Sequence, residues 1–283
     1  MRECRVTWHS SQARALDRGD LILSHFSLLG LEDFERRVSA AADAGFRGVG
    51  LFIGDYLVLR EEGRDDAWIE RVLARSGVCL AEIEVLVDWC PLADRGLRGL
   101  ETACHIGDRF KARHVVVNGP FSGTLRDAGP AFARLCDAAA EAGLLVALEH
   151  LPFTNVDSLT TALQIVEAAG RDNGGLCLDS WHHFRGFDEW EVLEALPAGR
   201  INCVQLNDGT DAPTVADYYH DTLNCRLPPG DGTFDLERYL ATLRDCGYAG
   251  PVSVEVLSED LRELPPERVC SELAKATRRL VPT

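Results

Sequence analysis

The sequence has 283 residues, of which 46% are hydrophobic and 26% are charged, and its formal net charge is -16. This length fits one large α/β domain or two smaller ones, and the composition is that of a globular protein rather than a collagenous or disordered chain. The acidic charge argues against a nucleic-acid-binding protein, because neutralising the phosphates of nucleic acid requires a basic surface.

The first ten residues, MRECRVTWHS, contain no long apolar segment. No run in the chain approaches the roughly 18 apolar residues of a membrane-spanning helix, so we expect a cytoplasmic protein with no membrane partner. The cysteines are scattered without a CxxC pair, which favours buried, reduced thiols over a disulfide framework or a structural zinc site. They are Cys4, Cys79, Cys90, Cys104, Cys136, Cys177, Cys203, Cys225, Cys246 and Cys270.

Short apolar runs predict eight buried strands along the chain. Most of the runs are almost continuously apolar, as is typical of strands covered on both faces. In chain order they begin at Leu21, Phe46, Val78, His114, Leu144, Gly175, Ile201 and Pro251. Between them lie helical patterns, several of which end at a glycine, over residues 31–45, 128–143, 156–170 and 235–247.

Strand and helix alternate with a period of about 30 residues, which predicts a (β/α)8 TIM barrel. A doubly wound open sheet is the alternative, but no GxGxxG motif follows the first predicted strand. No linker rich in Pro, Gly or Ser divides the chain, so we expect one domain over residues 1–283. In a TIM barrel the active site lies at the C-terminal ends of the strands.

Polar residues follow apolar ones at the ends of the last four predicted strands. Burying each of them is costly unless something pairs with it. A core carboxylate paired with an arginine would explain any one alone, but three carboxylates on neighbouring strands repel one another unless a cation lies between them. These residues are Glu149, Asp179, Gln205 and Glu255.

Three carboxylates and an amide oxygen form an all-oxygen set of ligands. Such a set suits Mg²⁺ or Mn²⁺, with Co²⁺ or Zn²⁺ able to substitute. The sequence therefore predicts one divalent metal ion bound by these four residues. The cluster keeps a net negative charge, and His182 and Arg226 are candidates to stand close and balance it.

The segment after Asp179, SWHHFR, carries further candidates. His182 lies three residues along and can face the same cavity, whereas the adjacent His183 is expected to point elsewhere. Arg185 could bind a substrate carboxylate or phosphate, or it could form a structural salt bridge.

Glu82 and Glu84 are two residues apart, so they share one face of the third predicted strand. Glu84 or Asp88 could reach the site and contact substrate, or an inward acid could be a layer of the barrel paired with a base. Trp181 and Phe153 could form an apolar wall of the pocket or belong to ordinary packing. Further pocket candidates are His25 and Asn118.

Five motifs, ALEHLP, LDSWHHFR, VQLND, RLPPGDGTFD and GYAGPVSVEV, resemble those of the sugar phosphate isomerase/epimerase family of xylose isomerase-like TIM barrels. The resemblance covers essentially the whole chain. It implies that the four strand-end residues bind the metal, that Glu149 and Glu255 also act as acid and base, and that His182 and Arg226 contact substrate oxygens. The third ligand position, commonly histidine, is Gln205 here, as in members that resemble hydroxypyruvate isomerase.

The expected chemistry is proton abstraction next to a carbonyl, through a metal-stabilised enediolate. We expect an isomerase or epimerase of a small sugar or sugar-like ketone. The alternative is a dehydratase of a cyclic polyol ketone such as 3-dehydroshikimate or an inosose. A DNA-repair endonuclease is disfavoured by the acidic charge and the few histidines. A third hypothesis is a barrel that binds a ligand without catalysing a reaction. The sequence leaves the oligomeric state open, so a homo-oligomer is allowed.

Overall fold

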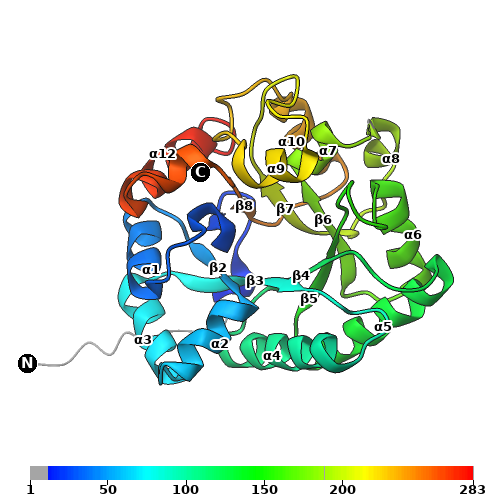
Figure 1. Cartoon of the computed structure of the whole chain (residues 1–283), viewed down its shortest axis with the longest axis horizontal. Coiled ribbons are helices and arrows are strands. Elements are labelled where there is room, and N and C mark those ends of the chain that lie inside the picture. The colour runs from blue at the N-terminus through cyan, green and yellow to red at the C-terminus, as the bar shows by residue number, and fades with distance from the viewer. Residues whose placement is uncertain (1–11, 188, 283) are drawn as a thin grey trace, which may run out of the picture.

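A computed structural model describes residues 12–187 and 189–282. Its strands are all parallel and close into a barrel in the order β1 to β8, surrounded by helices (Figure 1). Each strand overlaps one of the predicted apolar runs, which confirms the expected TIM barrel. The strands are β1 (Leu21–Leu23), β2 (Gly48–Phe52), β3 (Cys79–Leu86), β4 (His114–Asn118), β5 (Leu145–Glu149), β6 (Gly174–Asp179), β7 (Ile201–Leu206) and β8 (Val252–Val254).

Several helices begin at a residue whose side chain caps them. The side chain of Asp33 accepts a hydrogen bond from Arg36 N at the start of α1, and Asp235 does the same for Arg238 N at the start of α10. The α-helices are α1 (Phe34–Asp43), α2 (Ile53–Glu61), α3 (Asp66–Ser76), α4 (Asp94–Phe110), α5 (Leu125–Glu141), α6 (Leu159–Ala169), α7 (Ser180–Arg185), α8 (Trp190–Glu194), α9 (Tyr218–Asn224), α10 (Leu236–Asp245), α11 (Glu259–Arg262) and α12 (Pro266–Arg278). Two short 3-10 helices are η1 (Gln12–Ala15) and η2 (His25–Leu28).

Alternate residues of each strand face either the helices or the inside of the barrel. Outward side chains such as Val115 join the main hydrophobic core, which lies between the strands and the helices. Inside the barrel a separate small cluster is formed by Val116, Ala147, Cys177 and Cys203. The interior is therefore lined partly by small and sulfur-containing side chains, and this leaves room for polar groups from neighbouring strands.

The strand register brings the predicted site residues to one end of the barrel. Asp179 pairs with Gln205 across β6 and β7, and Gln205 pairs with Ser253 across β7 and β8. Glu149 pairs with Cys177, two residues before Asp179. Because parallel strands end at the same edge, the C-terminal ends of β5 to β8 converge as expected.

The described cysteines are all free thiols, and most of them are buried. This confirms the expectation of reduced cysteines for that part of the chain, and Cys4 lies outside the described residues. None of the helices between residues 12 and 282 is long and apolar enough to cross a membrane.

Candidate active site

Two strand ends and the helix that follows the second of them bring three metal-binding side chains together. One ligand atom from each of Glu149, Asp179 and His182 lies within 4.8 Å of the others. His182 Nε2 is 3.6 Å from both Glu149 Oε1 and Asp179 Oδ2. All three side chains are buried. Helix α7 places His182 one turn after Asp179, because Asp179 caps this helix by accepting a hydrogen bond from Trp181 N at 2.9 Å.

Arg226 supplies the positive charge of the site. Its Nη1 donates hydrogen bonds to Asp179 Oδ2 at 2.8 Å and to Glu255 Oε2 at 3.0 Å. Its Nε donates to the carbonyl of Thr222 at 3.0 Å, and its guanidinium lies 5.5 Å from the centre of the Trp181 ring. The guanidinium is thus fixed between two buried carboxylates from β6 and from the end of β8.

Gln205 is oriented differently from the metal ligand that the sequence predicts. Its amide Nε2 donates to Glu255 Oε1 at 2.9 Å and to Glu82 Oε1 at 3.0 Å, and its Oε1 accepts from Cys177 Sγ at 3.2 Å. The amide oxygen therefore faces Cys177 rather than the cluster of Glu149 and Asp179. The physical reason is the buried carboxylate of Glu82, whose Oε1 accepts one of the amide hydrogens.

Glu84 lies on β3, and its side chain reaches the segment that follows β1 and contacts the site indirectly. Its Oε1 accepts from His25 N at 2.8 Å, and its Oε2 lies 2.9 Å from Ser24 Oγ. The same hydroxyl is 3.1 Å from Glu255 Oε1, so Ser24 links the two carboxyl groups. Asp88, the other acid considered on this segment, is exposed and pairs with Arg95 at 3.5 Å, away from the site.

Arg185 forms the structural salt bridge rather than facing the cluster. Its Nε lies 3.2 Å from Asp221 Oδ2, and the arginine side chain is 3% exposed. The guanidinium also stacks over the rings of Trp181 and Phe234, at 4.9 and 5.2 Å from their centres. These contacts occupy the group that we considered for a substrate carboxylate or phosphate.

Replacing Arg185 by methionine should destabilise the protein by about 3–5 kcal/mol, because the buried carboxylate of Asp221 loses its cation. Urea unfolding of the variant and the wild type measures this difference. Arg171→Met is a matched control, since Arg171 pairs with Asp137 on the surface and should contribute less than about 1 kcal/mol. A loss for Arg185→Met as small as that of the control would contradict the structural role.

The remaining candidates fall around this cluster. The ring of His183 packs against the ring of Trp190, with the ring centres 4.5 Å apart, and so points away from the cluster, as expected. The half-exposed Phe153 contacts His182, with the ring centres 6.3 Å apart. His25 Nε2 points outward to Asp55 Oδ2 at 3.2 Å. Asn118 pairs in register with Glu149, and its buried Oδ1 has no hydrogen-bond partner among the described residues.

Burial changes the proton affinities of the site. It raises the pKa of Glu149 well above the ordinary value, and the nearby charges of Glu255 and Asp179 raise it further. Burial also raises the pKa of Glu255 to about 8, although Arg226 acts in the opposite direction. The pKa of His182 is lowered well below the ordinary value, first by burial and then by Arg226, so its imidazole is neutral near pH 7.

These residues fit a divalent metal ion. Glu149 and Asp179 offer carboxylate oxygens, and His182 offers a neutral ring nitrogen within the same small space. A cation there would relieve the repulsion that raises the pKa of Glu149. The donors present are therefore two oxygens and one nitrogen, whereas Glu255 Oε2 is paired with Arg226 Nη1 at 3.0 Å.

Affinity for a divalent metal should increase with pH in this site. Glu149 has a raised pKa in the metal-free protein, so it must release a proton to bind the ion. Below that raised pKa we expect the affinity to rise about tenfold per pH unit for each proton released. His182 adds no competing proton because its pKa is lowered. Calorimetric titration with Mn²⁺ at several pH values measures this, and an affinity that does not change with pH would contradict it.

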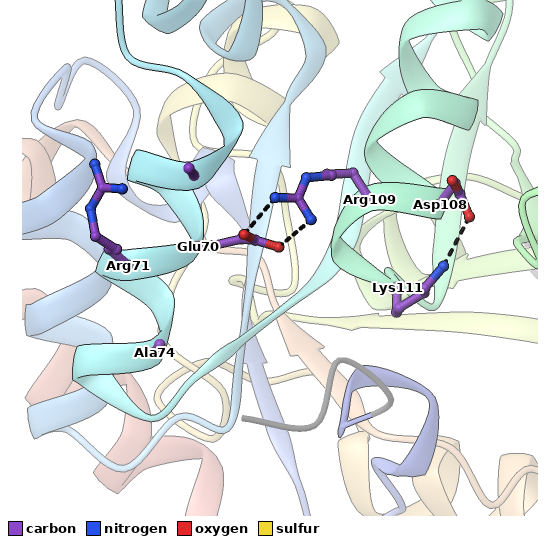
Figure 2. A pocket seen from close by; sticks show the side chains of 7 residues that line it. Glu70, Arg71, Ala74, Asp108, Arg109 and Lys111 are labelled. Atoms are coloured by element: carbon purple, nitrogen blue, oxygen red, sulfur yellow. Dashed lines mark hydrogen bonds and ion pairs between the residues drawn. The ribbon is translucent and has the colours of Figure 1, made fainter. Parts of the chain in front are cut away.

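A surface groove of about 730 Å³ lies between α3 and α4, outside the barrel (Figure 2). Four of its charged side chains are paired, Arg109 with Glu70 at 2.6 Å and Lys111 with Asp108 at 2.9 Å, and Arg71 lies at its edge (Figure 2). The groove is lined by helix residues and by none of the strand-end side chains. Its position, away from the strand ends, makes it a poor candidate for catalysis.

A family model for xylose isomerase-like TIM barrels matches residues 38–280 of this chain. The chain belongs to this family. The solved IOLI protein with a bound zinc atom has a similar fold, with a TM-score of 0.82 and 21% sequence identity. The superposition covers 93% of this chain and 98% of that one.

Two curated relatives of this xylose isomerase-like barrel are enzymes. The chain is 34% identical over 135 residues to an inosose isomerase of Halalkalibacterium halodurans, which is 47% of this chain and 46% of the relative. It is 31% identical over 240 residues to a 3-dehydroshikimate dehydratase of Pseudomonas aeruginosa, which is 81% of this chain and 37% of the relative. The matched regions thus span less than half the length of each relative.

Sequence reasoning did not find three residues that complete this xylose isomerase-like site. The hydroxyl of Tyr218 lies 3.1 Å from His182 Nδ1, and Asn207 Nδ2 donates to Asp179 Oδ1 at 2.6 Å. Ser24, the residue after β1, places its hydroxyl 3.1 Å from Glu255 Oε1. Asn207 lies within the motif VQLND, directly after β7, which is a usable signal, whereas no pattern in the sequence places Tyr218, the first residue of α9, near His182.

Proposed function

We propose that this chain is a divalent-metal-dependent isomerase or epimerase of a small sugar or sugar-like ketone. The observation that carries the proposal is the meeting of two buried glutamates with raised pKa, Glu149 and Glu255, around Asp179 and Arg226. Acid–base catalysis near neutral pH needs carboxyl groups whose pKa is raised in this way.

One divalent ion would be bound by Glu149 and Asp179, with His182 as the third donor in the present arrangement. Gln205 and Glu255, the other ligands that the family resemblance implies, would join if the Gln205 amide turned and Arg226 released Glu255. The ion would supply Lewis-acid polarisation of a substrate carbonyl. The oxygen donors suit Mn²⁺ or Mg²⁺, and the imidazole extends the choice to Co²⁺ or Zn²⁺.

The two glutamates would move the proton. A carboxyl group with a pKa of about 8, as for Glu255, is partly protonated and partly ionised near neutral pH. One glutamate would therefore take the proton next to the carbonyl while the other donates one. Return to the opposite face gives an epimer, and delivery to the neighbouring carbon gives an aldose–ketose isomer.

His182 and Arg226 would orient the substrate oxygens. The neutral imidazole of His182 lies at the cluster and contacts the Tyr218 hydroxyl at 3.1 Å, which fixes the ring. The guanidinium of Arg226 carries hydrogen-bond donors beside Asp179. The ring of Phe153 lies next to both His182 and Tyr218 and would form an apolar wall at the mouth of the site.

A metal-dependent dehydratase of a cyclic polyol ketone is the second candidate. It is favoured by the similarity over 81% of this chain to a protein described as a 3-dehydroshikimate dehydratase. It shares the first step, in which a glutamate removes the proton next to the carbonyl. The hydroxyl on the next carbon then leaves as water, with the second carboxyl group supplying its proton. The substrate in both candidates is a small molecule, with no nucleic acid as partner.

Solvent deuterium exchange distinguishes the two candidates. Metal-loaded protein is incubated in deuterated water with a panel of ketoses, inososes and 3-dehydroshikimate, and products are followed by nuclear magnetic resonance. Deuterium in a substrate that also gives an isomer supports the first candidate, and loss of water supports the second. Metal-stripped protein and Glu149→Gln are the controls. Metal-loaded protein that exchanges no proton in any of these compounds would contradict both.

A further inference from the structure

A second group of metal-binding side chains lies inside the barrel, separate from the cluster at its mouth. It consists of Glu82 on β3, His114 on β4 and Cys203 on β7. One ligand atom from each lies within 4.8 Å of the others, and all three side chains are buried. Glu82 and His114 are neighbours in strand register, and barrel closure brings Cys203 to them from the opposite side.

Two atoms of this interior group form an ion pair with each other but make no well-aligned hydrogen bond. Glu82 Oε2 and His114 Nε2 have no hydrogen-bond partner among the described residues, although they lie only 3.4 Å apart. The relative exposures of the two residues are 0% and 1%, so water does not satisfy these atoms from the surface. Their separation is longer than that of an ordinary N–H···O hydrogen bond, so a cation could give both atoms a closer partner.

Of the two carboxylate oxygens of Glu82, one is held by a hydrogen bond from another described residue. Its Oε1 accepts a hydrogen bond from Gln205 Nε2 at 3.0 Å, which leaves Oε2 directed toward His114. One anchored carboxylate, one imidazole and one thiol then face a shared point. Carboxylate oxygen, imidazole nitrogen and thiolate sulfur together are a donor set typical of Zn²⁺, and softer than the donors at the mouth.

We propose that Glu82, His114 and Cys203 form a second metal site that takes a thiol-binding divalent ion such as Zn²⁺. Cys203 would bind as the thiolate and His114 as the neutral imidazole, each after releasing a proton to solvent. The ion would join β3, β4 and β7 from within the barrel and replace the long contact between Glu82 Oε2 and His114 Nε2. This site does not depend on the proposed activity, because none of its donors belongs to the cluster of Glu149, Asp179 and His182.

Cobalt tests the proposal because sulfur bonded to Co²⁺ gives a charge-transfer absorption in the near ultraviolet, which oxygen and nitrogen donors do not. The full chain is produced in cobalt-supplemented medium, so that the ion is present while the barrel folds. We expect the absorption band, and one cobalt per chain in addition to the ion at the mouth, measured by elemental mass spectrometry. Cys203→Ser should lose the band and that one ion.

Cys177→Ser is the matched control. Cys177 pairs with Cys203 in strand register and lies in the same interior cluster, but its Sγ donates to Gln205 Oε1. The control should keep the band. Glu149→Gln should lose the ion at the mouth and also keep the band, which separates failure of this proposal from failure of the proposed function.

Wild-type protein without the band would overturn the proposal, whether or not the variants fold. A band that persists in Cys203→Ser, or that disappears in Cys177→Ser while Cys203 is intact, would also overturn it. Circular dichroism establishes that each variant is folded. If Cys203→Ser does not fold, His114→Gln replaces it, and the extra cobalt should then be absent.

Discussion

Glu255→Gln should slow exchange of the substrate proton with solvent by about 10²–10⁴-fold, the contribution typical of a positioned acid–base group. Glutamine has nearly the same shape and can still hydrogen-bond to Ser24 and Arg226, but it cannot take up or release a proton near neutral pH. The measurement is the rate of deuterium incorporation into the substrate found in the screen. Glu272→Gln is the control, because Glu272 pairs with Arg268 on the surface.

The metal content of Glu255→Gln decides between two roles for this glutamate. Arg226 Nη1 lies 3.0 Å from Glu255 Oε2, so in this arrangement Glu255 neutralises the arginine and the variant should keep its metal. Loss of the metal would instead show that Glu255 is a ligand, as the family resemblance implies. An exchange rate equal to that of the wild type would contradict its role in moving the proton.

Arg226→Met should destabilise the metal-free protein by about 3–5 kcal/mol, because it leaves buried carboxylates without their cation. Asp179 and Glu255 both accept from Arg226 Nη1. The loss should grow as the pH rises, since an unpaired carboxyl group takes up a proton at lower pH and loses its charge. Urea unfolding at several pH values, without metal, measures the effect.

Adding a divalent metal should restore part of the stability lost in Arg226→Met, because the ion supplies positive charge next to Asp179. Arg268→Met is the control, since Arg268 pairs with exposed Glu272 and should contribute less than about 1 kcal/mol. A metal-free Arg226→Met variant as stable as the wild type would contradict the charge-balancing role. If metal stabilised Arg226→Met no more than it stabilises the wild type, the expected rescue would be wrong.

The fold could be predicted because its signals are local in the sequence. A strand covered on both faces has to be apolar at almost every position, so runs such as HVVVN stand out. Parallel strands that end at one edge then bring Glu149, Asp179, Gln205 and Glu255 together without any detail of the loops. The inward face shared by Glu82 and Glu84 follows from the two-residue period of a strand.

The sequence by itself determined the barrel and the strand ends that form its site, and the tertiary structure decided the partner of each side chain there. Arg185 and Asp221 are 36 positions apart, and Gln205 and Glu82 are 123 apart. No periodic pattern connects residues at such separations. The loop after β7 places Arg226 between two carboxylates, and closure of the barrel brings Cys203 to His114 and Glu82. Local patterns decide burial, whereas hydrogen-bond and charge partners depend on how distant segments meet in space.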